Sequence, residues 1–321
     1  MIKNMKPILY YLVGLPASGK STWAKNMVNN DTILLSSDNL REELYGDINN
    51  QEHNGELFQE INKRVKNLLK QGKNVIYDAT NISSKRRISF LKELKKIDCY
   101  KQCIYFCENI MTCISNDMNR NRNVGYDVIK RMYKNLQIPM YFEGWDDIEI
   151  IRNKVKSIET SLEYKCNSYN DYITILTNTC ILDIIDCIEL GQDNPYHTLS
   201  VSRHMYYTYK WLKQYNIQNK YLLIASLFHD IGKAYCKEFK DKYAHYYGHE
   251  NVSAQLLTML LYDESNFSKE EIIKIATYVQ LHMKLLNLNG SDKGKEKFRN
   301  LIGKELFEDL VLLHNADTQA K

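Results

Sequence analysis

The sequence predicts an α/β domain, a parallel sheet covered by helices, in residues 1–155, and an all-α domain in residues 179–321. Three observations support this prediction. Strand-like apolar runs alternate with helix-like segments in the first half, which is typical of parallel sheets. A glycine-rich loop joins the first strand to the first helix. The second half shows helical patterns without strands, and residues 156–178 lack a sustained period and are expected to be a connector.

The strands and helices of the first half follow from its hydrophobic pattern. Continuous apolar runs predict strands at residues 8–13, 31–35, 74–78, 99–107 and 149–152. Helical periodicity predicts helices at residues 21–28, 39–45, 52–71, 84–96, 111–122 and 126–136. The carboxyl ends of the strands then share one edge of the sheet, where open α/β sheets bind their ligands.

Composition limits the classes of protein that fit. The 321 residues, 44% of them hydrophobic, suffice for two domains of ordinary size. Lys and Arg number 43 against 39 Asp and Glu, a small excess that permits a nucleic-acid partner without requiring one. No apolar stretch reaches the length of a membrane span, so we expect no membrane partner. The eight cysteines form no C-x-x-C pair and are expected to be reduced, as in a cytoplasmic protein.

The loop after the first strand fits the pattern G-x4-G-K-S of phosphate-binding loops. Backbone N–H groups and the N-terminus of the following helix favour an anion there. Lys20 is expected at the β- and γ-phosphates of a nucleoside triphosphate such as ATP, and the Ser21 hydroxyl at Mg²⁺. The nucleotide-binding candidates in the loop are Gly14, Leu15, Pro16, Ala17, Ser18, Gly19, Lys20, Ser21 and Thr22. The alternative is a chance glycine turn.

Two aspartates follow strands at the same edge of the sheet. Asp38 comes just after the second strand, where a carboxylate could accept the proton of an attacking hydroxyl. The same position suits the N-cap of the next helix, and the two roles can coexist. Asp78 stands at the tip of the third strand. Position alone does not decide whether Asp38 is a proton acceptor or a helix cap, and it gives Asp78 no specific role.

Residues 8–145 resemble the 5′-hydroxyl polynucleotide kinase domain of phage and bacterial end-healing enzymes. Four segments carry the resemblance: Gly14–Ala24, Ser37–Arg41, Val75–Asn81 and Val124–Tyr133. The resemblance implies that Asp38 is the general base for the 5′-hydroxyl. It implies further that Arg41 contacts a neighbouring phosphate of the nucleic acid and that Asp78 lies in the acceptor site.

The same resemblance implies a lid over the donor phosphates. It places Arg120 there, where an arginine would stabilise charge on the transferring group. Such families often carry a second lid arginine; Asn116 stands at the equivalent place here, or Arg122 substitutes for it. The alternative for Arg120 and Arg122 is a solvated basic loop. Small-molecule P-loop kinases match the first third of the chain nearly as well.

Metal-ligand residue types mark the second half. Helices are expected at residues 180–190, 201–215, 221–227, 252–261, 269–281 and 304–313. Seven of the eight histidines lie after residue 196, which makes this half the place to look for a site. A His–Asp pair, His229 and Asp230, ends an apolar helix. Imidazole and carboxylate ligands suit a transition metal such as Mn²⁺, Co²⁺, Ni²⁺, Fe or Zn²⁺.

An ordered set of such residues resembles the ligands of the HD-domain phosphohydrolases over residues 180–321. The set is His204, His229, Asp230, His249, His282 and Asp317. The resemblance implies one or two metal ions, with Asp230 as the bridging, catalytic ligand. Lys233 is expected either to hold a substrate phosphate or to be a surface lysine. The other histidines, expected at the surface or in supporting positions, are His53, His197, His245 and His314.

Three functions fit these features. The first is a bifunctional enzyme that heals nucleic-acid ends, with RNA the expected substrate: an ATP-dependent 5′-hydroxyl kinase joined to a metal-dependent 2′,3′-phosphatase or cyclic phosphodiesterase. A separate RNA ligase is then a possible partner. The second is a nucleoside or sugar kinase joined to a nucleotide phosphohydrolase. The third is a kinase joined to a metal-binding domain that only senses a nucleotide.

Overall fold

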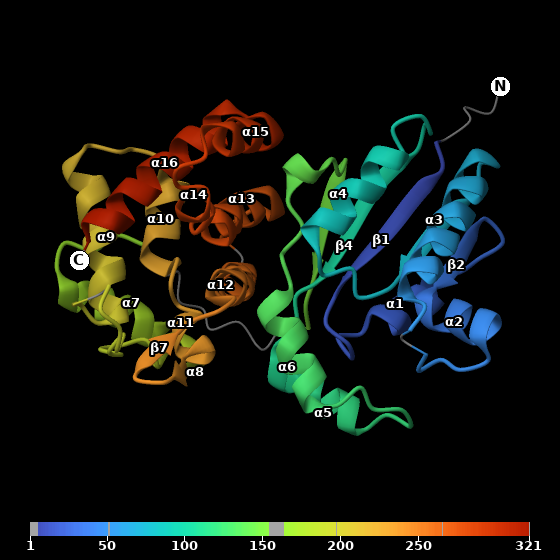
Figure 1. Cartoon of the computed structure of the whole chain (residues 1–321), viewed down its shortest axis with the longest axis horizontal. Helices are drawn as coiled ribbons and strands as arrows, with labels where there is room; N and C mark the ends of the chain where they lie inside the picture. Colours follow the sequence, from blue (N-terminus) through green and yellow to red (C-terminus); the bar gives the residue numbers. More distant parts are fainter. Residues whose placement is uncertain (1–5, 51, 154–163, 197, 265, 321) are drawn as a thin grey trace. The chain divides into compact units, whose positions relative to one another are not determined.

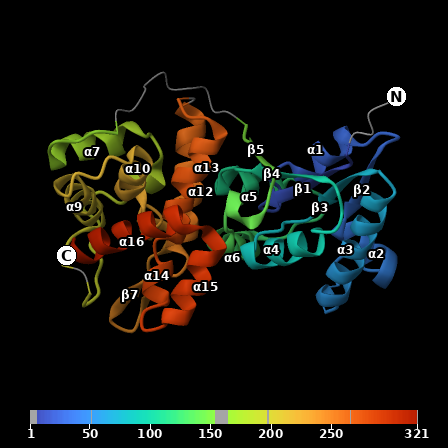
Figure 2. The same ribbon diagram turned by 90° about the horizontal axis from the view of Figure 1, so that it is seen from above.

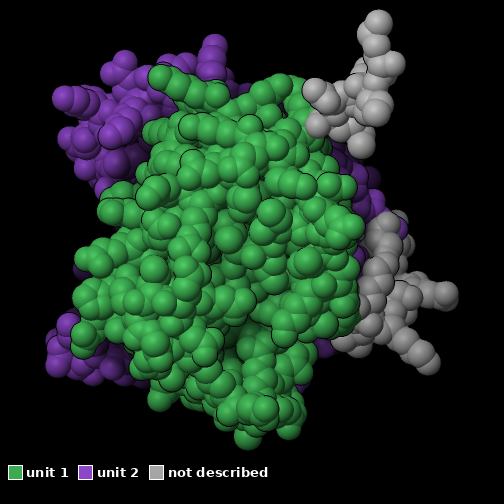
Figure 3. All heavy atoms as spheres, turned by 90° about the vertical axis from the view of Figure 1, so that its right-hand side faces the viewer, with its two compact units in different colours: residues 1–132, 139–153 green, residues 133–138, 154–321 purple. Residues whose placement is uncertain are grey.

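A computed structural model of the protein describes residues 6–50, 52–153, 164–196, 198–264 and 266–320. His197 and residues 156–163 of the expected connector lie outside the described residues. The chain forms two compact units, coloured separately in Figure 3. Unit 1 comprises residues 1–132 and 139–153, and unit 2 comprises residues 133–138 and 154–321. Among the described residues, no helix combines the length and apolar character needed to cross a membrane.

Unit 1 is built on a five-stranded parallel sheet in the order β2-β3-β1-β4-β5. The strands are β1 (Ile8–Gly14), β2 (Thr32–Ser36), β3 (Asn74–Asp78), β4 (Tyr100–Phe106) and β5 (Asp147–Ile151). Its helices are α1 (Lys20–Met27), α2 (Ser37–Tyr45), α3 (Asn54–Lys70), α4 (Ser84–Glu93), α5 (Ile110–Met118) and α6 (Tyr126–Asn135), with a 3₁₀ turn η1 (Tyr141–Glu143). Figures 1 and 2 show α1 on one side of the sheet and α3 and α4 on the other. The apolar β1 is central and buried because both faces of the sheet are covered.

A buried ion pair fixes the loop after β3 to the sheet. Arg87 and Glu143 are both fully buried, with 2.6 Å between Arg87 Nη2 and Glu143 Oε1. Arg87 Nη1 also donates to the backbone carbonyl of Asn81, whose side-chain amide donates to the carbonyl of Leu12 in β1. Such a pair is tolerated in a core only when its hydrogen bonds are satisfied, as here. The strand tips that carry the first site are thereby held in register.

Unit 2 is helical. Its helices are α7 (Tyr169–Asn178), α8 (Leu182–Ile185), α9 (Val201–Gln214), α10 (Lys220–Phe228), α11 (Lys233–Cys236), α12 (His249–Glu264), α13 (Lys269–Leu281), α14 (Lys284–Asn287), α15 (Asp292–Ile302) and α16 (Lys304–Gln319). Helices α12 and α13 are buried along most of their length and form the centre of the unit. One short antiparallel hairpin, β6 (Glu238–Lys240) and β7 (Tyr243–His245), interrupts the helices.

The expected fold classes, a parallel sheet with helices followed by a helical domain, are confirmed. Three local features differ from the sequence prediction. Helix α7 forms where a connector was expected, started by a capping box between Ser168 and Asp171. The hairpin at residues 238–245 was not expected, because three-residue strands are too short to show a period. The expected helix at residues 180–190 is reduced to α8, and Cys180 before it has a left-handed φ of 54°.

Residues 133–138 belong to unit 2 although the sequence gives no sign of a boundary there. The side-chain amide of Gln255 in α12 donates to the carbonyls of Tyr133 and Leu136. Gln280 Oε1 in α13 accepts the backbone N–H of Ile138 at 3.0 Å. Buried amides of these two helices therefore satisfy the backbone where α6 ends, which a local pattern cannot reveal.

Candidate active sites

The glycine-rich loop wraps around the side chain of Lys20. Lys20 Nζ donates to the carbonyl oxygens of Gly14 at 3.0 Å and of Leu15 at 2.5 Å. A Cβ on Gly14 would lie 2.9 Å from Phe106 Cβ, and Gly19 adopts a φ of 95°, so both positions require glycine. The loop has the curled geometry in which backbone N–H groups can surround a phosphate.

Burial perturbs the two charged groups beneath this loop. It lowers the pKa of the Lys20 ammonium to about 8, although the carboxylate of Asp78 acts in the opposite direction. Burial also raises the pKa of Asp78, against the hydrogen bond from Ser21 and the charge of Lys20. Burial therefore destabilises the charged form of both groups. A bound nucleotide would offset this, because its phosphates would stabilise the ammonium and its metal ion would stabilise the carboxylate.

Asp38 does not cap helix α2. That role belongs to Ser36, whose hydroxyl oxygen accepts the backbone N–H of Asp38 at 3.3 Å. The Asp38 carboxylate is held instead by two guanidinium groups: Arg41 Nη1 lies 2.9 Å from Oδ1 and Arg122 Nη1 lies 3.3 Å from Oδ2. The alternative role of Asp38 as N-cap is therefore wrong, and its carboxylate is paired with Arg41 and Arg122 at the carboxyl edge of the sheet.

Arg41 is the more buried of these two arginines, at 5% exposure. Its Nη2 donates to Asn54 Oδ1 at 3.0 Å, and its buried Nε has no hydrogen-bond partner among the described residues. A buried donor without an acceptor is costly, so Arg41 is prepared to bind an anion. Sequence reasoning missed Asn54 because it begins α3 and is distant in sequence from Arg41.

The loop between α5 and α6 carries both lid candidates. Arg122 donates through Nε to Asn49 Oδ1 and through Nη2 to the carbonyl of Ile48, so it is not merely solvated. Arg120, which is exposed, and Arg122 both line one cavity in unit 1. Buried Asp117 organises this loop, because its carboxylate accepts the backbone N–H groups of Val124 and Gly125. Asn116 donates to the carbonyl of Ala17 in the glycine-rich loop at 3.1 Å.

The cavity that Arg120 and Arg122 line lies in unit 1 and has a volume of about 550 Å³. Its charged lining consists of Lys20, Asp38, Arg41, Asp78, Arg86, Arg120, Arg122 and Arg131. Six cations against two carboxylates make the cavity suited to a polyanion. Its size is typical of sites that enclose a small molecule or one end of a larger one.

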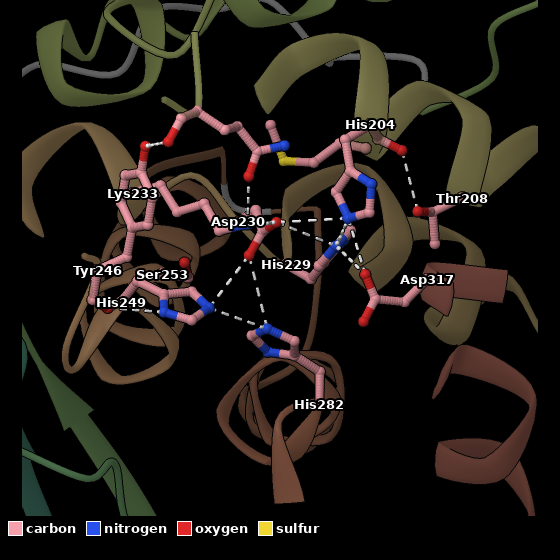
Figure 4. Close-up of polar contacts among 12 residues, drawn as sticks. His204, Thr208, His229, Asp230, Lys233, Tyr246, His249, Ser253, His282 and Asp317 are labelled. Atoms are coloured by element: carbon pink, nitrogen blue, oxygen red, sulfur yellow. Dashed lines mark hydrogen bonds and ion pairs between the residues drawn. The ribbon is translucent and has the colours of Figure 1, made fainter. Parts of the chain in front are cut away.

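The second site gathers the ligand candidates of unit 2 from three helices and from the turns that follow two others (Figure 4). His204 lies in α9, His249 begins α12 and Asp317 lies in α16. His229 and Asp230 follow α10, and His282 follows α13. His204 Nε2 lies 2.7 Å from Asp317 Oδ1, and His249 Nε2 lies 3.2 Å from Asp230 Oδ1. All six predicted residues therefore converge.

Each imidazole of the set is oriented by a backbone carbonyl. The Nδ1 atoms of His204, His229, His249 and His282 lie 2.6, 2.9, 2.8 and 2.7 Å from the carbonyl oxygens of Ala320, Ser226, Tyr246 and Val279. Nδ1 therefore carries the proton, and in the neutral ring Nε2 presents a lone pair to the centre. Facing Nε2 atoms are only 3.3 Å apart in one pair and 3.2 Å in the other. Lone pairs brought this close repel each other unless a cation lies between them.

Asp230 sits between the two histidine pairs. Its Oδ2 lies 3.5 Å from the Nε2 atoms of both His204 and His229, and its Oδ1 faces His249 and His282. Two clusters with metal-ligand spacing share it: His204, His229 and Asp230, and Asp230, His249 and His282. The buried Oδ1 receives no hydrogen bond from the described residues. A buried carboxylate oxygen without a donor fits a metal ligand.

The charges of the second site also favour cations. Burial opposes ionisation of Asp230, but Lys233 and the histidines hold its pKa well below the ordinary value. The pKa of Asp317 is likewise held low by His204 and His229 against its burial. Lys233 is buried, with Nζ 2.7 Å from Asp230 Oδ2 and 2.8 Å from Gln192 Oε1. The alternative of Lys233 as a surface lysine is therefore wrong.

Three other histidines that the structure describes, His53, His245 and His314, belong to neither group with metal-ligand spacing. His245 stacks on Tyr247, with ring centroids 5.4 Å apart, and His53 stacks on Tyr45. His314 precedes Asp317 in α16, and its Nδ1 is buried without a partner among the described residues. Gln192, which orients Lys233, was missed because no periodicity marks the loop that carries it.

Two domain families match the chain. Residues 9–139 match the AAA domain family, and residues 196–318 match the HD domain family. The chain joins a kinase-like P-loop domain to an HD domain. The expected order of the two domains is thereby confirmed, and the HD domain carries the residue types that imply a metal.

Similarity to known proteins covers parts of the chain. The L-seryl-tRNA(Sec) kinase of Methanococcus maripaludis is 26% identical over 158 residues, which are 47% of this chain and 61% of that protein. A chain of a Pnkp1/Rnl/Hen1 complex is 25% identical, with a TM-score of 0.32 over 51% of this chain and 50% of that chain. A chain of the Pnkp1/Rnl/Hen1 RNA repair complex is 23% identical, with a TM-score of 0.36 over 50% of this chain and 52% of that chain. This chain thus spans less than two thirds of each of these three proteins.

Proposed function

We propose that this protein is a bifunctional RNA end-healing enzyme. The P-loop domain transfers the γ-phosphate of ATP to a 5′-hydroxyl, and the HD domain removes a 2′,3′-cyclic phosphate or a 2′- or 3′-phosphate. The observation that carries the kinase half is the Asp38 carboxylate. It is free of the helix cap and lines the same cavity as Lys20 and Ser21.

Residues of the P-loop domain could supply each part of a phosphoryl transfer. Asp38 accepts the proton of the attacking hydroxyl, and the oxygen attacks the γ-phosphorus as ADP leaves. Lys20 and Arg120 would neutralise charge on the phosphates of a bound nucleotide, and the Ser21 hydroxyl would hold its Mg²⁺. Arg122, which donates to Asp38, would exchange this contact for the donor phosphates when they are bound.

The distribution of arginines supports a polynucleotide acceptor. Lys20 and the lid arginines suffice for a triphosphate, yet Arg41, Arg86 and Arg131 also line the cavity. A nucleoside carries no phosphate for them, whereas a nucleic-acid 5′ end carries one on the next linkage. The buried Nε of Arg41 is suited to receive it.

The HD residues support hydrolysis of a phosphate ester. His204, His229, Asp230 and Asp317 would hold one ion; His249 and His282, with Asp230 as the bridge, would hold a second. Bound ions of this kind activate a water and neutralise the charge of a phosphate ester. Lys233 is placed to hold that phosphate beside Asp230. Ends with a 5′-phosphate and a free 3′-hydroxyl are substrates for a ligase, so a separate RNA ligase is the partner class.

A second candidate for the P-loop half is a kinase that acts on an aminoacyl group carried by tRNA. The relative named L-seryl-tRNA(Sec) kinase favours it, at 26% identity. A third is a nucleoside or sugar kinase, which the cavity of about 550 Å³ could also enclose. Competition of labelled-phosphate transfer by RNA oligonucleotides, seryl-tRNA and free nucleosides separates the three, because only the true acceptor class competes at low concentration.

The decisive experiment assays both ends of one RNA oligonucleotide. With γ-labelled ATP, the intact protein should label a 5′-hydroxyl end, and Lys20→Ala and Asp38→Ala should reduce labelling at least ~100-fold. His229→Ala and Asp230→Ala should lose transition metal, measured by plasma mass spectrometry, and end-phosphate removal, while labelling persists. No transfer by the intact protein would refute the kinase half. No metal-dependent hydrolysis of any phosphoester would favour a sensor domain.

A further inference from the structure

The structure assigns a single-stranded RNA-binding surface to the hairpin that joins two parts of the HD site. We define the aromatic hairpin as residues 237–247. It connects α11, which begins with Lys233, to α12, which begins with His249. This inference deepens the proposed function and rests on it, because it names how the HD site would select a polynucleotide.

Aromatic rings are unusually exposed on and beside this hairpin. Phe239, Tyr243 and Tyr247 are 64%, 39% and 68% exposed. The neighbouring loop adds Tyr196 at 77% exposure, and Asp193 in that loop accepts the backbone N–H of Ala244 at 2.9 Å. These four make up half of the eight exposed large aromatic side chains in the described part of the chain. A folding core gains nothing from rings in this position, so they point to a binding role.

The rings at the end of the hairpin lie close together along the chain. Tyr243 and His245 are two residues apart in β7, which places them on one face of the strand. Tyr247 lies in the turn that follows β7. The rings of His245 and Tyr247 are already stacked, with centroids 5.4 Å apart and an interplanar angle of 11°. Successive bases of a single strand stack on such flat rings regardless of sequence.

Lysines flank the rings on the hairpin. Lys240 pairs directly with Tyr243 across the two strands, and Lys242 Nζ lies 5.0 Å above the Tyr243 ring. Both are exposed, and the hairpin's acidic residues, Glu238 and Asp241, offset part of this charge. Glu238 is paired with Lys134. Ammonium groups beside stacking rings are the combination that single-stranded nucleic acid recognises, because bases and phosphates alternate along it.

The hairpin is fastened to the HD site at its end. Tyr246 donates its hydroxyl to the carbonyl of Gln192 at 2.6 Å, and Lys233 Nζ lies 5.5 Å from the centre of the Tyr246 ring. The carbonyl of Tyr246 accepts from His249 Nδ1, as Figure 4 shows. At its base, Lys237 donates to the carbonyl of Gly191. A strand stacked on Tyr243 and Tyr247 would therefore lead its end towards Asp230 and Lys233.

The test uses the full-length protein and a matched pair of double variants. Tyr243→Ala with Tyr247→Ala removes rings of 39% and 68% exposure from the hairpin. Tyr207→Ala with Tyr215→Ala, on and after α9, removes rings of 40% and 62% exposure elsewhere in the HD domain. A 12-nucleotide RNA with 4-thiouridine is photo-crosslinked, and the modified peptides are mapped by mass spectrometry. In parallel, KM is measured for a 3′-phosphorylated oligonucleotide and for a 3′-phosphorylated mononucleotide.

Crosslinks within residues 237–247 are expected, with a yield about tenfold lower in the hairpin variant and unchanged in the α9 variant. KM for the oligonucleotide should rise by about the same factor while mononucleotide turnover stays constant. Tyr243→Phe with Tyr247→Phe should restore both. Crosslinks that avoid the hairpin would overturn the proposal. The proposal would also be wrong if the hairpin variant bound RNA as well as the unaltered protein but eluted at a different volume in gel filtration, because the rings would then form a protein–protein contact. If neither phosphate is hydrolysed, the proposed function fails, and crosslinking still decides the hairpin.

Discussion

Among single residues, Lys20 is a motif residue whose protonation state depends on its burial. Its ammonium is buried in the glycine-rich loop and donates to the carbonyls of Gly14 and Leu15. Burial lowers its pKa to about 8, so the cation is present below that pH and is lost above it. The carboxylate of Asp78 limits this shift.

The pH dependence of nucleotide binding should reveal Lys20. Affinity for a non-hydrolysable ATP analogue with Mg²⁺ should fall ~tenfold between pH 7 and pH 9, because the free protein loses the cation on which the phosphates depend. Isothermal titration calorimetry measures this. In Lys20→Arg, the guanidinium stays charged, so whatever affinity remains should change little over the same range. A flat profile for the unaltered protein would contradict the assignment.

Between elements, close backbone contact positions the HD ligands. Gly232 follows Asp230 by two residues and donates its N–H to Ser253 Oγ in α12 at 2.8 Å. A Cβ there would lie 2.5 Å from the carbonyl oxygen of His249 and 2.7 Å from the backbone nitrogen of Ser253. Both neighbours are backbone atoms, which cannot swing aside.

Gly232→Ala should therefore force α11 and α12 apart. We expect a loss of ~1–3 kcal/mol in unfolding free energy from overpacking and a lower bound-metal content, since Asp230 and His249 would separate. Gly55→Ala is the matched control: Gly55 lies in α3, and a Cβ there meets nothing within 4 Å. That control should be neutral or stabilising by ~1 kcal/mol. Equal thermal stability of the two variants would contradict the prediction.

The end of α12 carries a pH-sensitive contact. Tyr164 donates its hydroxyl to Glu264 Oε2 at 2.5 Å, while the buried Oε1 has no partner among the described residues. Burial raises the pKa of Glu264 to about 7, above its ordinary value of 4.5. The native state therefore holds a proton that the unfolded state releases between these values, so this group destabilises the fold as pH rises through that window.

Glu264→Gln should remove this dependence. The variant should melt a few degrees above the unaltered protein at pH 8 and at the same temperature at pH 4.5, since a neutral amide mimics the protonated acid. Differential scanning fluorimetry across pH 4.5–8 tests it. Glu305→Gln, at an exposed carboxylate in α16, serves as the control. A melting difference independent of pH would show that the carboxyl does not titrate in this window.

In the whole molecule, positive charge is concentrated in one cavity, and the net charge is small. The net charge is only +4, yet five arginines line the cavity of the P-loop domain. Affinity for RNA should therefore depend on salt through a few specific cations, and not through a uniform field. Arg86 is one of them; its guanidinium carbon lies 5.7 Å from the centre of the Phe58 ring.

Arg86→Gln should make the negative slope of log affinity against log salt shallower by ~0.7, because one phosphate contact on a single strand is lost. Fluorescence anisotropy with a 5′-hydroxyl RNA between 50 and 300 mM salt gives the slope. Lys85→Gln removes the same charge from the adjacent residue, which does not line the cavity, and should leave the slope unchanged. Equal slopes for the two variants would remove Arg86 from the RNA path.

Sequence alone determined the features that depend on short stretches of chain. The glycine-rich loop is such a stretch, because its curl follows from φ angles that Gly14 and Gly19 permit. Strand and helix types followed from periodicity, and the ordered histidines and aspartates predicted a cluster that the structure assembles. The short hairpin escaped prediction because strands of three residues show no period.

Only the tertiary structure decided which side chains meet. Arg122 reaches Asp38 across 84 positions of sequence, and Gln192 orients Lys233 across 41. The cap at Ser36 freed Asp38, and the central place of Asp230 between two imidazole pairs arose from helices that pack around it. Local sequence sets the backbone conformation of each segment. The positions of these charged groups depend instead on packing between segments that are distant in sequence, and the sequence of one segment does not contain the energy of that packing.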